Sequence, residues 1–67
     1  MAILVSKEVR EGILAVRGTG RTNMFDVDAV KEIAYELGYE EVVDWIENHE
    51  REYAAGIFEG FEVQTAE

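Results

Sequence analysis

The sequence has no cysteine, no proline and only one histidine, His49. The lack of cysteine excludes disulfides and thiolate metal sites, and a single histidine excludes a site built from several imidazoles. A domain of 67 residues buries only about 60% of the surface that its unfolded chain exposes, so it commonly needs further support. Self-association is the support that remains, and we expect a homo-oligomer.

Long apolar runs are also missing. The apolar segment at residues 1–5 is much shorter than the roughly 20 residues of a membrane-spanning helix, and it is too short for the apolar region of a signal peptide. The lack of cysteine is consistent with a reducing compartment. We therefore expect a soluble, cytoplasmic protein that makes no membrane contact.

Basic residues are scarce, with six lysines and arginines against fifteen aspartates and glutamates, for a net charge of −9. Direct binding to duplex nucleic acid is disfavoured, because neutralising the phosphates requires basic patches. The charge is unevenly distributed, because residues 1–25 carry four basic and two acidic side chains, whereas residues 26–67 carry two basic and thirteen acidic ones. The basic side chains of the first segment are thus candidates for binding carboxylates.

Helical periodicity predicts one mainly α domain over residues 1–67, with three helices and no linker. The first helix spans about residues 6–17, with Ser6 as its N-cap and Gly18 or Gly20 at its end. Its apolar face consists of Val9, Gly12, Ile13 and Val16.

The second and third helices are separated by Gly38. The second begins after Asp26, a predicted N-cap, and Gly38 ends it. The third spans about residues 39–58, but Glu50 falls within its apolar stripe. Either the helix breaks near residues 48–49, or Glu50 pairs with Arg10 or Arg17, and the pairing is the interpretation that we favour.

The two ends of the chain have the composition of strands. Residues 2–5 and 61–65 are rich in apolar and β-branched side chains. They can form a short two-stranded ribbon, with each other or across a dimer, although such a ribbon is barely stable alone.

The loop at residues 17–26 combines two glycines and two arginines with the start of the second helix. Arginines and helix-start amides suit a phosphate or nucleotide, but the loop lacks the lysine and spacing of a P-loop. The alternatives are a simple helix connection and a contact surface for a protein partner.

Three other features allow both a structural and a binding interpretation. Arg10, Leu14 and Arg17 lie off the apolar face of the first helix, either as a half-exposed surface or as an interface. Trp45 packs at the edge of the core or anchors a partner. Aromatic and methionine side chains exceed what a three-helix core needs, which favours association: Met24, Phe25, Phe58 and Phe61.

Catalytic and metal-binding patterns are not found. No serine or cysteine nucleophile stands in a known motif with His49, and the acidic spacing matches no EF-hand loop. We therefore expect no enzymatic activity, no cofactor and no metal. The acidic helix face is either solvated or a mimic of nucleic acid: Glu40, Glu41, Asp44, Glu47 and Glu52.

The run Thr-Asn-Met-Phe-Asp at residues 22–26, with the segments at 9–17 and 43–47, resembles a family of very short bacteriophage and prophage proteins of unknown function. The resemblance covers about residues 8–60 and supplies no functional residues. It implies a phage-derived accessory protein, a type that often inhibits a host or defence protein or sequesters a signalling nucleotide.

We therefore predict a small binding protein that contacts a second copy of itself and a host or phage protein, with a small anionic nucleotide as the alternative ligand. The predicted contact surface consists of Arg10, Leu14, Arg17, Arg21, Asn23, Met24, Phe25 and Trp45.

Overall fold

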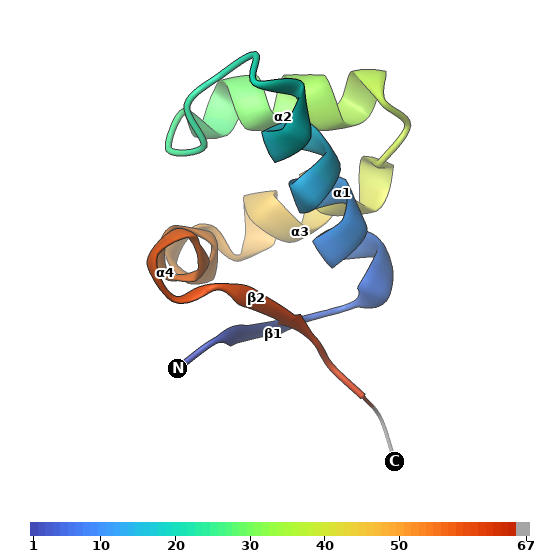
Figure 1. Ribbon diagram of the computed structural model, residues 1–67. Coiled ribbons are helices and arrows are strands. Elements are labelled where there is room, and N and C mark those ends of the chain that lie inside the picture. Colours follow the sequence, from blue (N-terminus) through green and yellow to red (C-terminus); the bar gives the residue numbers. More distant parts are fainter. Residues whose placement is uncertain (66–67) are drawn as a thin grey trace.

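A computed structural model describes residues 1–65 as a mainly helical domain whose two ends form a short sheet (Figure 1). The elements in chain order are β1 (Ile3–Val5), α1 (Lys7–Thr19), α2 (Val27–Glu36), α3 (Glu40–Asn48), α4 (Glu50–Glu59) and β2 (Phe61–Val63). The predicted fold class, mainly α with a terminal ribbon, is confirmed. Within the described residues, no helix is long and apolar enough to cross a membrane.

The first two helices begin and end at the predicted residues. The Ser6 hydroxyl accepts a hydrogen bond from the Val9 amide at 3.2 Å, and Gly20 ends α1 with φ of 65°. At α2, the Asp26 carboxylate accepts from the Ala29 amide at 3.2 Å. Each cap satisfies an amide that has no partner within its helix. These predicted caps are confirmed.

The predicted third helix is instead two helices that meet at His49, where the backbone has φ of −141° and ψ of 49°. Side chains bind the last carbonyls of α3: the Asn48 amide donates to Asp44 at 2.8 Å, and His49 Nδ1 lies 2.9 Å from the Trp45 oxygen. Such local bonds compete with helix continuation. The break leaves Glu50 exposed.

The predicted pairing of Glu50 with Arg10 or Arg17 is therefore wrong. None of the ion pairs within residues 1–65 involves Glu50. The change of direction at residue 49 removes the conflict that motivated the pairing, because Glu50 no longer continues the helix that carries the buried Ile46.

The ends of the chain pair with each other in parallel, with Ile3 opposite Phe61 and Val5 opposite Val63. The Ile3 amide donates to the Gly60 carbonyl at 3.0 Å, and the Gln64 amide donates to Val5 at 2.7 Å. In Figure 1 this sheet lies at one end of the molecule, beside α4. The strands are supported by core packing, since an isolated ribbon of this size is not stable.

The core lies between the helices and the inner side of β1. Gly12 of α1 is buried where α1 approaches Val42 and Tyr39. The buried apolar side chains are Val5, Val9, Ile13, Val16, Val30, Ile33, Ala34, Val42, Ile46 and Tyr53.

Candidate binding groove

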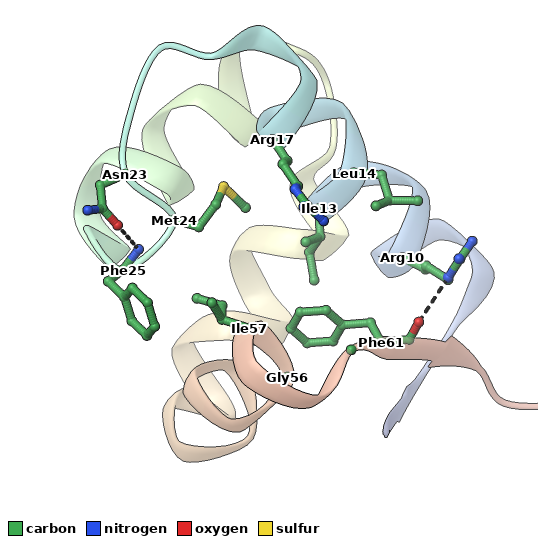
Figure 2. Close-up of a pocket in the computed structure, with 11 residues that line it drawn as sticks. Arg10, Ile13, Leu14, Arg17, Asn23, Met24, Phe25, Gly56, Ile57 and Phe61 are labelled. Carbon is green, nitrogen blue, oxygen red and sulfur yellow. Dashed lines mark hydrogen bonds between the residues drawn. The ribbon is translucent and has the colours of Figure 1, made fainter. Parts of the chain in front are cut away.

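A groove of about 490 Å³ lies between α1, the loop from α1 to α2, and the junction of α4 with β2 (Figure 2). Its volume is within the range of small-ligand sites. The lining residues come from these three segments: Arg10, Ile13, Leu14, Arg17, Asn23, Met24, Phe25, Gly56, Ile57, Gly60 and Phe61.

The inner surface of the groove is apolar. Ile13 is buried, and Met24, Ile57 and Phe61 are partly buried against the same core. The Phe61 ring lies directly over Gly56, so closely that a Cβ on residue 56 would overlap ring atoms. The glycine therefore allows β2 to place an aromatic ring in the groove.

Two arginines from α1 supply its charge. Figure 2 shows Arg17 extending from α1 toward Ile13, whereas Arg10 lies at the far end, where its Nε donates to the Phe61 carbonyl at 3.0 Å. Among the described residues, neither Arg10 nor Arg17 forms an ion pair. No acidic side chain of residues 1–65 lines the groove. The charge of the groove is therefore positive, opposite to the net charge of −9 of the whole chain.

Several hydrogen bonds hold the loop that forms one wall, including two that position Met24 and Phe25. The Tyr53 hydroxyl donates to the Met24 carbonyl at 2.6 Å. Figure 2 shows the other bond, in which Asn23 Oδ1 accepts from the Phe25 amide at 2.8 Å. The first bond ties the loop to α4 from a buried side chain. Together they preform the wall that carries Met24 and Phe25.

Tyr53→Phe is expected to lower the free energy of unfolding by about 1–2 kcal/mol, because the Met24 carbonyl loses its donor. Burial raises the pKa of the Tyr53 phenol to about 12, above the value of about 10 for the unfolded chain. The neutral phenol thus stabilises the fold below pH 10, and this contribution is lost as the pH rises from 10 to 12. Urea unfolding across this range measures both effects.

In Tyr53→Phe the part of the alkaline loss that comes from residue 53 should disappear. Tyr35→Phe serves as the control, because Tyr35 is 65% exposed and its hydroxyl forms no hydrogen bond within residues 1–65. An equal alkaline loss in the Tyr53→Phe variant and the wild type would contradict this assignment.

Six of the eight residues in the predicted contact surface line this one groove. Arg21 instead pairs with Glu36, 3.1 Å away. Trp45 borders a separate hollow of about 390 Å³ and stacks on His49, with a centroid distance of 4.9 Å. The six that line the groove are Arg10, Leu14, Arg17, Asn23, Met24 and Phe25.

Sequence reasoning missed the contribution of α4 and β2, namely Gly56, Ile57, Gly60 and Phe61. For Phe61 the sequence did contain a signal of a binding role, because Phe61 is one of the side chains in excess of what a three-helix core needs. The helix break at His49, which orients α4, was one of the two alternatives at residues 48–50, and periodicity alone could not choose it over a paired Glu50. The start of α2 also differs from a free anion site, because the Asp26 carboxylate already accepts from the Ala29 amide.

No curated protein and no solved structure is significantly similar to this chain. One family model matches residues 5–61, a range that spans α1 to α4 and reaches the last residue of β1 and the first of β2. The chain therefore belongs to the DUF5049 family, described as a domain of unknown function.

Proposed function

We propose that the chain is a non-catalytic protein-binding module whose groove docks an acidic segment with a bulky apolar side chain. One observation carries the proposal: an apolar groove with two arginines that have no carboxylate partner within residues 1–65, in a chain of net charge −9. Surfaces of this composition suit protein contacts, in which arginine and aromatic residues are enriched.

The two parts of the groove have different tasks. An apolar side chain of the partner packs against Met24, Ile57 and Phe61, and its burial drives binding. A neighbouring carboxylate pairs with the Arg17 guanidinium, whose planar donors bind carboxylates bidentately. Because hydrogen bonds already hold the loop, little conformational entropy is lost on docking.

The partner that we propose is a host-cell protein. This part of the proposal rests on the resemblance of residues 22–26 and their flanking helices to short phage and prophage proteins, which often act on host or defence proteins. In this proposal the chain acts in the cytoplasm of the host as an accessory or inhibitory factor.

Selection of random peptides on the immobilised protein tests the groove directly, because such a selection requires no named partner. We expect enrichment of acidic peptides with an aromatic or large aliphatic anchor. Arg17→Glu should weaken the selected peptides by about tenfold or more, because a charge-assisted pair becomes a repulsion. Calorimetric titration measures the change.

Arg51→Glu is the matched control, since Arg51 is exposed on α4, lies outside the groove and undergoes the same change of charge. It should retain nearly wild-type affinity. Peptides without acidic residues, or an equal loss of affinity in both variants, would contradict the proposal.

The volume of the groove and its arginines also favour a second candidate, a small anionic nucleotide with an aromatic base. Thermal shift against nucleotides and cyclic dinucleotides separates the two candidates. A nucleotide present at about 100 times its dissociation constant stabilises the fold by about 2.7 kcal/mol. Without such a shift for any nucleotide, the peptide interpretation stands alone.

A further inference from the structure

A projecting aromatic side chain stands beside the groove. Phe58 on α4 is 80% exposed, and its ring packs against Phe25, with centroids 5.2 Å apart. Phe25 lines the groove and is itself half exposed. The face that contains the groove thus also carries a side chain of the size and polarity that the groove accepts.

The charges near Phe58 are opposite to those of the groove. Glu59 follows it directly, and the exposed Glu62 lies just beyond Gly60. Glu59 binds the amino group of Met1 at 2.9 Å, whereas Glu62 forms no ion pair within the described residues. An apolar anchor beside carboxylates is the chemistry that we assigned to the docked segment, and the chain itself contains it.

We infer that a second copy of the chain docks in this groove through Phe58. Because Phe58 and the groove are adjacent on one face, a two-fold axis between them places each Phe58 in the groove of the other copy. The same axis carries Glu59, the residue after Phe58, toward the groove of the other copy, whose charge comes from Arg10 and Arg17. This inference rests on the proposed use of the groove as a docking site.

Such a dimer regulates the proposed function. The groove of each copy is occupied in the absence of a partner, so an acidic partner segment binds only by displacing Phe58. The dimer also covers Phe25 and Leu14, which are 49% and 43% exposed in the single chain. Without a partner, the protein is thus a dimer in which the apolar side chains around the groove are shielded from water.

Sedimentation equilibrium across micromolar concentrations tests the dimer. Physiological salt is appropriate, because its Debye length of about 8 Å screens the repulsion between two acidic copies. Phe58→Ser should raise the dimer dissociation constant by about 30-fold or more, as for a central aromatic anchor. Tyr35→Ser, which changes an aromatic on α2 that is 65% exposed and outside the groove, should leave it unchanged.

A measurement on the wild type makes the test independent of how the variants fold. In a mixture of differently labelled copies, nuclear Overhauser effects should connect the Phe58 ring of one copy with Met24 and Ile57 methyl groups of the other. A wild type that stays monomeric, a dimer without these contacts, or a folded Phe58→Ser variant that dimerises normally would overturn the inference.

Competition separates this inference from the proposed function. A selected acidic peptide should convert dimers to monomers, and a peptide that binds without doing so would overturn the inference. If the chain is monomeric and Arg17 still binds acidic peptides, only the dimer is wrong. If the dimer forms through Phe58 but no peptide depends on Arg17, the proposed function is wrong.

Discussion

Gly12→Ala is expected to lower the free energy of unfolding by about 1–3 kcal/mol, the usual cost of overpacking a core. A Cβ at this position would overlap the Val42 side chain and press on the Tyr39 ring. Val42 is fully buried, so it cannot move out into solvent without losing its core contacts. The higher helix propensity of alanine, worth about 1 kcal/mol, offsets only part of the cost. Thermal unfolding should show a lower Tm, by about 4–8 °C per kcal/mol.

Gly18→Ala is the matched control on the same helix. No atom lies within 4 Å of a Cβ built at Gly18, and its φ is not positive. The same substitution should therefore stabilise the protein, by up to about 1 kcal/mol. Opposite signs for the two variants would show that the approach of α1 to α3 at Gly12 limits the substitution. An unchanged or higher Tm for Gly12→Ala would contradict this packing.

Gly56→Ala is expected to disrupt the groove as well as the fold. The added Cβ would overlap the Phe61 ring, so the ring must leave the groove or β2 must move away from α4. We expect a loss of about 1–3 kcal/mol in the free energy of unfolding. Peptides selected on the wild-type groove should lose about tenfold or more in affinity, because Phe61 forms part of its inner surface.

A double-mutant cycle with Phe61→Leu isolates this contact. Leucine is smaller and more flexible than the ring, so Gly56→Ala should cost less in its presence than in the wild type. Denaturant unfolding of the four proteins measures the difference. Additive losses would show that the strain lies elsewhere along α4.

Local sequence signals predicted the first half of the fold well. Ser6 and Asp26 cap their helices as expected, because a side-chain oxygen at each position accepts from an amide three residues later. Gly20 and Gly38 adopt positive φ at the predicted ends. These features depend on a few neighbouring residues, so a single sequence suffices to find them.

The second half was harder to predict, because one local signal was ambiguous and the groove depends on contacts between different elements. The break at His49 is stabilised by side-chain bonds to α3 carbonyls, and periodicity cannot decide between that break and a paired Glu50. Six predicted contact residues gather in one groove because they lie on α1 and its following loop. The other wall of the groove could not be predicted in this way. It depends on the close packing of the Phe61 ring against Gly56, which only the folded structure shows.

The pairing of the first strand with the last strand determines when the groove can be completed during folding. β1 leaves the ribosome before every helix, and it has no partner until β2 follows. The helices can form locally in the meantime, but a pairing between residues so far apart must close the whole chain first. Phe61 lies on β2 and lines the groove, so the groove is complete only after the two strands have paired.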